Sequence, residues 1–326
     1  MKTAKVQHYV PQFLLRNFGN GKKDQLWVFD KTTGRSFSTN AKNIASESRF
    51  YEFEYAGARL SLEPYLSKIE SSAKPILSHV LRADSLAGLD ATGRATIAVF
   101  LSIQLTRTRT FREQWREFPR MLSDAFDARD DRVADGSQAA ELIRDISGND
   151  VKSETGRFMV DAPKALAHHF LSKDWVLAAT TRIHPFVTSD NPLALQNVID
   201  RPHRGNLGLG VPGIEIYLPL SPVRALAMWC RSLIRPVLQA SAAHPGKSRH
   251  HSSGVGHAPE GVIQLAEALS TGRPLAYSRE NVENFNSLQI ARSERYVFSF
   301  ANDFELAKEM LGAHPSLRAG PRMEAH

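Results

Sequence analysis

Residues 214–229 of this 326-residue chain read IEIYLPLSPVRALAMW, and this stretch decides the fold. Apolar side chains occupy every second position of its first half, where Ile214, Ile216, Leu218 and Leu220 alternate with Glu215, Tyr217 and Pro219. A period of two predicts a strand with one face buried. Ser221 and Pro222 then mark a turn, so residues 223–229 are expected to return as the second strand of an antiparallel hairpin.

Strand-like segments also occur near both ends of the chain, with helical segments between them. The further predicted strands are residues 26–30, 35–39, 174–181, 186–188 and 296–300. Apolar residues three and four apart predict helices over 62–80, about 90–117 (ended by Pro119), 279–292 and 303–311. This order lacks a repeated βαβ unit, so it predicts an α+β fold with a largely antiparallel sheet.

We expect a single domain over residues 1–315 with a central helical insertion. The helical part covers about 58–170, and the sheet part covers about 1–57 and 171–300. The N-terminal strands are expected to join the C-terminal sheet, which opposes the alternative of separate helical and sheet halves. Residues 316–326 are predicted to form a disordered tail.

Composition indicates a globular protein of the cytoplasm. Hydrophobic residues make up 42% and charged residues 23% of the chain, which excludes wholesale disorder. The one cysteine, Cys230, excludes a disulfide framework and any site built on two thiolates. No apolar run is long enough to span a membrane, and the first residues lack the apolar core of a secretory signal.

The charge balance favours acidic partners. The formal net charge is +7, and residues 94–120 hold six Arg against two Glu. This excess is typical of proteins that contact nucleic acid or another polyanion. Arg109, Arg112 and Arg116 are three and four residues apart, so they predict one exposed basic stripe on a helix.

The first candidate site is an N-terminal row of polar residues. His8, Gln12 and Arg16 are four residues apart, so a helix through them would place all three on one face. Such a row suits the binding of a phosphate or carboxylate, with His8 as acid or base near neutral pH. The alternative is a docked helix whose polar residues only cap or bridge its neighbours.

The second candidate site is the end of the strand at residues 186–188. Ser189, Asp190 and Asn191 follow it directly, and they bring a hydroxyl, a carboxylate and an amide into one turn. Asp190 is a candidate general base or ligand of Mg²⁺ or Mn²⁺, and Asn191 a candidate substrate contact. The alternative is local, because Asp and Asn before Pro192 also build turns through backbone hydrogen bonds.

Three further groups of polar residues stand out. Gln104 and Arg107 lie within an aromatic stripe, and Glu63 and Glu70 share a face of the preceding helix, which predicts a Glu70–Arg107 ion pair or an acid–base or metal site. Asn286, Gln289 and Arg292 are expected to hydrogen-bond between elements. The histidines of the Gly/Ser-rich loop 241–261, which we expect to be mobile, have no ordered zinc-site spacing: His244, His250, His251 and His257.

Several well-defined catalytic motifs are missing from the sequence. It contains no G-x-x-x-x-G-K-[ST], no H-E-x-x-H and no G-x-S-x-G. The glycines at 208, 210 and 213 lie in a predicted loop and not directly after a strand, which is a weak signal. The motif content disfavours nucleotide-driven motors, Rossmann dehydrogenases and zincin proteases.

The chain resembles a known family through its N-terminal segment. Residues 8–18, HYVPQFLLRNF, are similar to the signature of an uncharacterised, mainly bacterial family of unknown function named for its H-Y-V-P motif. The resemblance continues through residues 27–31, 186–192, 218–222 and 286–297, with one departure at Arg109, where we expect proline. The family implies no activity, but it adds weight to the matched polar residues His8, Gln12, Arg107, Asp190 and Asn191.

These patterns together favour a hydrolase that acts on a phosphodiester or another acidic substrate. His8 and Asp190 are the expected catalytic residues, with Asp190 as the metal ligand in a metal-assisted reaction. Substrate contacts are expected from Gln12, Arg16, Arg107, Ser189 and Asn191. The alternative is a non-catalytic module that binds nucleic acid or a small ligand. In the hydrolase, His8, Asp190 and Asn191 are expected to line one concavity.

Overall fold

The computed structural model describes residues 5–129, 132–143, 148–199, 205–242 and 260–322. The predicted mobile loop at 241–261, with its four histidines, lies almost entirely outside these residues. The chain is α+β, with mostly antiparallel sheets, as predicted. No helix in the described ranges is both long and apolar enough to cross a membrane.

A five-stranded sheet forms the centre of the fold, in the order β12-β7-β11-β10-β9. Its strands are β7 (Asp174–Ala179), β9 (Ala194–Asn197), β10 (Ile214–Ser221), β11 (Arg224–Trp229) and β12 (Leu275–Ala276). Strands β10 and β11 form the hairpin predicted from residues 214–229, and only β12 runs parallel to its neighbour.

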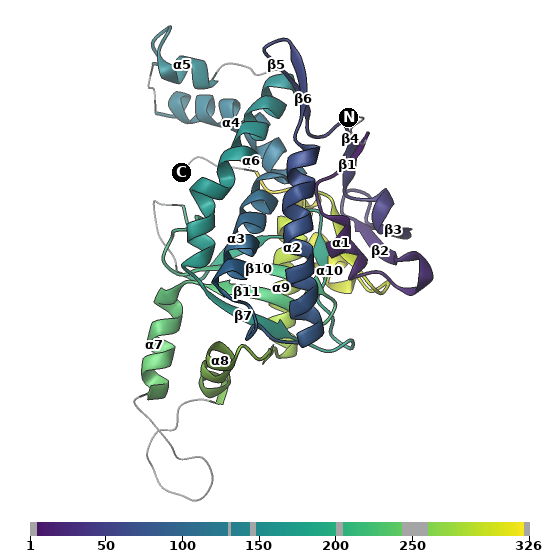
Figure 1. Ribbon diagram of the computed structural model, residues 1–326. Coiled ribbons are helices and arrows are strands. Elements are labelled where there is room, and N and C mark those ends of the chain that lie inside the picture. Colours follow the sequence, from purple (N-terminus) through teal and green to yellow (C-terminus); the bar gives the residue numbers. More distant parts are fainter. Residues whose placement is uncertain (1–4, 130–131, 144–147, 200–204, 243–259, 323–326) are drawn as a thin grey trace, which may run out of the picture.

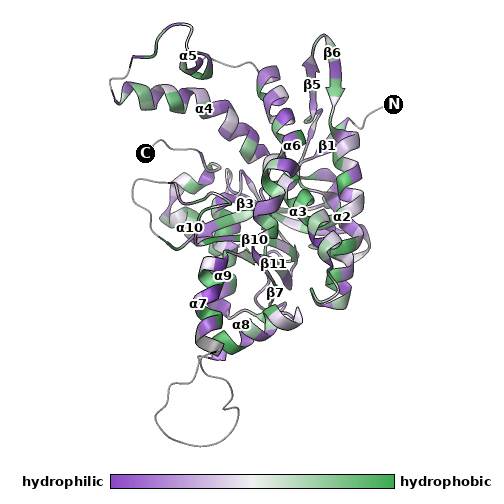
Figure 2. Ribbon diagram, turned by 60° about the vertical axis from the view of Figure 1, so that its left-hand side comes forward, coloured by the Kyte–Doolittle hydropathy of each residue, from purple (hydrophilic) through white to green (hydrophobic). Residues whose placement is uncertain are grey.

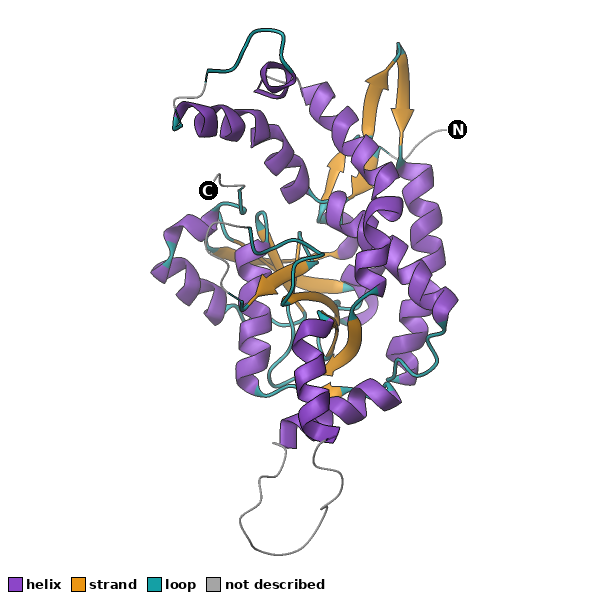
Figure 3. Ribbon diagram, turned by 90° about the vertical axis from the view of Figure 1, so that its left-hand side faces the viewer, coloured by secondary structure: helices purple, strands orange, loops and turns teal. Residues whose placement is uncertain are grey.

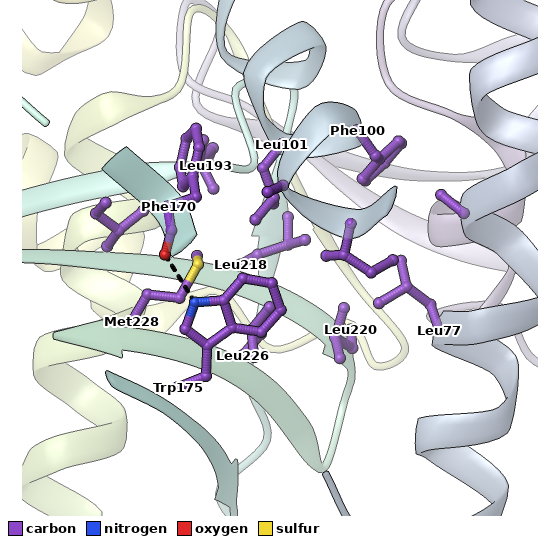
Figure 4. Packing of buried hydrophobic residues seen from close by; sticks show 14 of the residues in the cluster. Leu77, Phe100, Leu101, Phe170, Trp175, Leu193, Leu218, Leu220, Leu226 and Met228 are labelled. Atoms are coloured by element: carbon purple, nitrogen blue, oxygen red, sulfur yellow. Dashed lines mark hydrogen bonds between the residues drawn. The ribbon is translucent and has the colours of Figure 1, made fainter. Parts of the chain in front are cut away.

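Helices cover both faces of this sheet (Figure 1). The first layer contains α2 (Glu63–Ala83), α3 (Ala91–Thr106) and α6 (Gly148–Leu171). They pack on the face that carries the alternating apolar residues of β10. In Figure 4 the indole N–H of Trp175 donates to the Phe170 carbonyl oxygen at 2.9 Å inside this layer.

The opposite face of the sheet is covered by α9 (Arg279–Arg292). Small residues of β7 and β11, such as Ala178 and Ala227, lie against Phe285 of α9 and Tyr217 of β10. Tyr217 is therefore only 5% exposed. The predicted half-buried strand is largely covered on both faces, because alanines allow the helix to approach closely.

A second sheet joins the two ends of the chain, in the order β3-β2-β13-β8. Its strands are β2 (Gln25–Asp30), β3 (Arg35–Asn40), β8 (Thr188–Ser189) and β13 (Tyr296–Ser299). Strand β2 pairs antiparallel with β13, which confirms that the N-terminal strands join the C-terminal part of the fold. Helix α10 (Glu305–Ala313) packs against this sheet.

The remaining elements are short or peripheral. They are β1 (Val6–His8), α1 (Gln12–Arg16), η1 (Gly21–Lys23), η2 (Ala41–Asn43), β4 (Ser46–Ser48), β5 (Glu52–Tyr55), β6 (Ala58–Ser61), α5 (Gln138–Ile143), α7 (Arg231–Ala242) and α8 (Glu260–Thr271). Figure 3 shows helices surrounding the central strands and the β5–β6 hairpin standing apart at the top.

The long helix predicted over residues 90–117 is two helices in the structure. Helix α3 ends at Thr106, and α4 (Arg109–Asp127) begins after Thr108, whose side chain accepts a hydrogen bond from the Phe111 amide. This N-cap starts a new helix. Pro119 lies inside α4, so the prediction that it ends the helix is wrong. Helix α4 carries hydrophilic and hydrophobic residues in alternation along its length (Figure 2).

The predicted disordered tail at 316–326 is wrong for its described part. Residues Pro315–Arg318 form the short helix η3, and Arg318 donates to the Lys31 carbonyl oxygen at 3.1 Å. Arg322 donates to both carboxylate oxygens of Glu294, at 2.9 and 2.8 Å. Glu294 is only 8% exposed, and a carboxylate so buried requires a cationic partner. Residues 323–326 lie outside the described part.

Candidate functional site

The predicted row His8, Gln12 and Arg16 exists, although only its last two members are helical. His8 ends strand β1, and α1 begins at Gln12 after Pro11. The Gln12 amide nitrogen lies 3.3 Å from His8 Nδ1, and Arg16 Nη2 donates to Gln12 Oε1 at 2.9 Å. The side chains therefore form one hydrogen-bonded chain.

The hydrogen bonds of His8 define its protonation state. Nε2 lies 3.2 Å from the Lys42 carbonyl oxygen, which only accepts, so Nε2 carries the proton. Nδ1 then accepts from the Gln12 amide. Burial lowers the pKa of His8, and the contacts with the Lys42 carbonyl and Glu70 offset this only in part. His8 is therefore a neutral imidazole at neutral pH.

We expect the folded state to lose stability as the pH falls below about 6.5 because of His8. Its pKa when folded lies below the ordinary value of 6.5, so the unfolded chain binds this proton more tightly. The stabilisation is complete above pH 6.5 and is lost as the pH falls toward the folded pKa. Urea unfolding between pH 5 and 8, compared with His8→Gln, measures it, and identical pH profiles would contradict the assignment.

The row forms one wall of a pocket of about 290 Å³. The opposite wall is the polar face of α2, which contributes Glu63, Ser67, Glu70, Ser71 and Lys74. These residues are four, seven, eight and eleven positions from the first, so they share one face, while Leu66, Ala73, Leu77 and Val80 pack into the core from the other. Phe13 completes the lining.

Arg107 lies behind this pocket and holds its walls together. Its guanidinium donates to Glu70 Oε1 at 2.7 Å, to the Tyr51 hydroxyl at 3.0 Å and to the His8 carbonyl oxygen at 2.7 Å. Arg107 is only 2% exposed. The Glu70–Arg107 ion pair predicted from the sequence is confirmed. Arg107, predicted as a substrate contact, is not among the residues that line the pocket.

Glu63 is the pocket residue whose carboxylate is least satisfied by hydrogen bonds. Its Oε2 is buried and has no hydrogen-bond partner among the described residues. Burial raises the pKa of Glu63, Arg107 lowers it, and the nearby Glu70 raises it further. A carboxyl group with a raised pKa, facing a pocket beside a neutral imidazole, has the properties of a catalytic acid or base.

Asp190 lies outside this pocket lining and directly follows β8, the edge strand of the second sheet. Its carboxylate is fully buried and accepts three backbone N–H groups, from Glu294, Arg295 and Tyr296, at 2.8–2.9 Å. Both oxygens are therefore already bonded. Burial raises the pKa of Asp190 to about 6, against the lowering effect of these three hydrogen bonds.

Lys31 completes this structure from the other side of the same segment. Its side chain is fully buried, and Nζ donates to the carbonyl oxygens of Ile290 and Ser293 at 3.0 and 2.8 Å. We call Lys31 and Asp190 the clamp, because together they bind the backbone of residues 290–296. Burial lowers the pKa of Lys31 to about 8, and the charge of Asp190 opposes this shift.

The neighbours of Asp190 also bind protein groups. Ser189 donates to Gln289 Oε1 at 3.0 Å, and Asn191 donates to the Arg292 carbonyl oxygen at 2.9 Å. Gln289 donates onward to the Pro192 carbonyl oxygen. The polar residues spaced along α9 thus join it to the strand-end turn, which is the structural interpretation left open by the sequence.

A model of the family described as "Protein of unknown function (DUF4238)" matches residues 6–303. The chain belongs to the DUF4238 family. The match includes every residue of both the pocket and the clamp. No curated protein and no solved structure matches this chain.

The predicted site residues of this DUF4238 protein divide between the pocket and the turn that contains Asp190. His8, Gln12 and Arg16 line the pocket, whereas Ser189, Asp190 and Asn191 are absent from its lining. The reason is that the Asp190 carboxylate is directed at the backbone of residues 294–296. Within the described ranges, no group of three or more His, Cys, Asp or Glu side chains is arranged to hold a metal ion.

The predicted basic stripe of this DUF4238 protein is wrong. Arg112 is only 7% exposed, donates to Glu47 at 2.7 Å and lies over the Phe50 ring. Arg109 is 3.7 Å from the same Glu47, and Arg116 donates to Glu113. Carboxylates from β4 and α4 therefore neutralise the arginines, which the spacing of the arginines alone does not reveal.

Glu63 and Glu70 stand out in the sequence, whereas Ser67, Ser71 and Lys74 of the same pocket wall were not predicted. The sequence does contain a pattern that indicates this polar wall. Polar residues recur at helical spacing over residues 63–74, opposite an apolar stripe. That pattern is also typical of a solvated helix face. Only the contact of α2 with the N-terminal segment distinguishes the two.

Proposed function

We propose that this protein is a hydrolase whose active site is the pocket between α1 and α2. The observation that supports this most is the buried, unpartnered oxygen of Glu63 in a pocket that also contains the neutral imidazole of His8. Buried polar atoms without partners in a native protein call for an explanation, and a role in catalysis is one. In this proposal Glu63, and not Asp190 as predicted from the sequence, is the catalytic carboxyl group.

The charges at the pocket favour an acidic substrate. Lys74 lines it and has no ion pair within the described part of the chain. Arg16 also lines it, 3.7 Å from Asp24, and Arg107 offsets the charge of Glu70. The pocket volume of about 290 Å³ accommodates a single phosphodiester or carboxylate group with a small substituent, and it excludes a nucleic-acid duplex. A small acidic molecule is therefore a better fit than a long polyanion.

The proposed reaction uses the two titratable groups as a base and an acid. When the substrate attracts the Gln12 amide, His8 Nδ1 becomes free to take a proton from the attacking water. The water oxygen forms the new bond to the phosphorus or acyl carbon while the bond from that atom to the leaving oxygen breaks. The carboxylic acid form of Glu63, which its raised pKa favours, gives its proton to the leaving oxygen. Proton transfer from His8 back to Glu63 through solvent restores both groups.

We place the protein in the cytoplasm, consistent with its single cysteine.

Replacing Glu63 with glutamine is expected to lower kcat/KM by about 100-fold or more, as loss of a general acid does. The probes are bis(p-nitrophenyl) phosphate, p-nitrophenyl phosphate and p-nitrophenyl acetate, with release of p-nitrophenolate as the measurement. Glu154→Gln on α6 is the matched control, because Glu154 does not line the pocket.

Two results would contradict the proposal. One is undiminished turnover by Glu63→Gln. The other is saturable binding of the acidic probes without turnover by the wild type, which would favour the non-catalytic binding module. Lys74→Met provides a second check, since it should raise KM for the two phosphate probes and leave p-nitrophenyl acetate unaffected.

A further inference from the structure

A second pocket lies on the α9 face of the central sheet, away from the proposed active site. Its volume is about 470 Å³, within the range of small-molecule sites. It is formed by β9, β10, β11 and β12 together with α8 and α9. No residue of this pocket lines the pocket between α1 and α2.

The register of three strands creates a polar row in this pocket. Glu215 of β10 lies opposite Gln196 on β9 and opposite Trp229 on β11. Tyr217 is two residues further along β10 and therefore on the same face. A sheet thus places these four side chains side by side without any loop.

A hydrogen-bond network fixes the Glu215 carboxylate. The Tyr217 hydroxyl donates to Glu215 Oε2, and Gln196 donates to the same oxygen at 2.9 Å. The Trp229 indole N–H donates to the Tyr217 oxygen at 3.2 Å. Oε1 of Glu215 receives no hydrogen bond from any described residue, so the network holds one carboxylate oxygen ready for a ligand.

The rest of the lining that the structure describes is uncharged and includes four aromatic side chains. Tyr217, Trp229, Tyr277 and Phe285 all contribute, and of the lining residues that the structure describes Glu215 alone carries a charge. Aromatic rings attract cations through their faces, and a carboxylate without a cationic partner adds to this attraction. The aromatic rings and the Glu215 carboxylate therefore both favour a ligand that carries a positive charge. The rings also favour a ligand with an apolar part.

We propose that this pocket binds a small organic cation, a primary ammonium group attached to an apolar or aromatic body. The ammonium group donates to Glu215 Oε1 and lies against the aromatic rings. Gln196, Asn281 and Asn284 at the rim supply further polar contacts. The site is independent of the proposed hydrolase site, so either proposal can fail without the other.

Calorimetric titration with phenethylammonium tests this proposal, with 2-phenylethanol and phenylacetate as neutral and anionic analogues. We expect the cation to bind at least about tenfold more tightly than either analogue, because only the cation makes a charge-assisted contact with Glu215. Trp229 lies in the pocket, so binding should change the tryptophan fluorescence, and Trp229→Phe should remove that change.

Two variants locate the charge requirement. Glu215→Gln keeps an oxygen for Tyr217 and Gln196 but removes the charge, and it should weaken the cation about tenfold or more. Asn281→Lys places a cation at the rim on an exposed residue and should also weaken phenethylammonium. Glu267→Gln on α8 is the control, because Glu267 is outside the lining and should leave the affinity unchanged.

Three results would overturn the proposal. They are equal binding of 2-phenylethanol and phenethylammonium, unchanged affinity in a folded Glu215→Gln variant, and the absence of saturable phenethylammonium binding up to about 10 mM. Thermal melting of each variant separates loss of binding from loss of folding.

Discussion

Replacing Asp190 with alanine is expected to destabilise the folded protein by about 3–5 kcal/mol, the usual cost of breaking a buried charged interaction. Three buried or partly buried backbone N–H groups, of Glu294, Arg295 and Tyr296, lose their acceptor together. Lys31, the other member of the clamp, also loses the negative charge that most opposes the effect of burial on its pKa.

Asp190→Asn is expected to cost about 2–3 kcal/mol, less than alanine but far from neutral. One amide oxygen remains to accept hydrogen bonds, while the amide NH₂ group faces at least one backbone N–H. Urea unfolding at about pH 7.5, above the Asp190 pKa of about 6, gives both values. Asp161→Asn on the exposed side of α6 is the control.

The Asp190 experiment also tests the catalytic role expected from the sequence. If Asp190 acts only in the clamp, added Mg²⁺ or Mn²⁺ leaves the melting temperature of wild type and variant unchanged. A wild-type Asp190 that binds a metal would show a rise in melting temperature that Asp190→Asn lacks. Unchanged stability in Asp190→Asn would contradict the clamp.

Replacing Arg107 with methionine is expected to destabilise the protein by a similar amount, about 3–5 kcal/mol. The change leaves Glu70, the Tyr51 hydroxyl and the His8 carbonyl oxygen without their shared donor. Arg107→Lys should recover less than half of this loss, because one ammonium group cannot reproduce the planar fork that reaches three acceptors.

Denaturant unfolding of a double-mutant cycle isolates the ion pair. The cost of Arg107→Met should be smaller in a Glu70→Gln background, because no uncompensated carboxylate remains there. Arg82→Met, at an exposed position near the end of α2, is the control and should change stability by less than about 0.5 kcal/mol. Additive effects of Arg107→Met and Glu70→Gln would show that the pair does not couple.

Several local features of this protein were predictable because their signals are short in range. The alternation in residues 214–220 and the Ser221–Pro222 turn predicted the hairpin of β10 and β11. Helix α9 matches its predicted range, since Ser278 caps it and apolar residues recur along it. The spacing of His8, Gln12 and Arg16 placed them in one row even though His8 belongs to a strand.

The resemblance of the motifs to a family located important residues without distinguishing their roles. His8 and Gln12 line a pocket, whereas Asp190 and Asn191 bind backbone groups of the segment after α9. The residues of both groups are polar, and both groups lie at the end of a short strand, β1 or β8. From sequence alone a buried acceptor of backbone N–H groups and a catalytic carboxylate look the same.

The sequence by itself therefore determined the α+β class, the central hairpin, the polar N-terminal row and the Glu70–Arg107 pair. Only the tertiary structure decided that Asp190 clamps residues 294–296, that Glu47 neutralises Arg109 and Arg112, and that α9 covers the second face of the hairpin. Periodicity and turn signals act between residues a few positions apart. A buried charge needs a partner, and only the folded chain determines which group lies near it. That partner can be far away in the sequence, as Glu294 is 104 residues from Asp190.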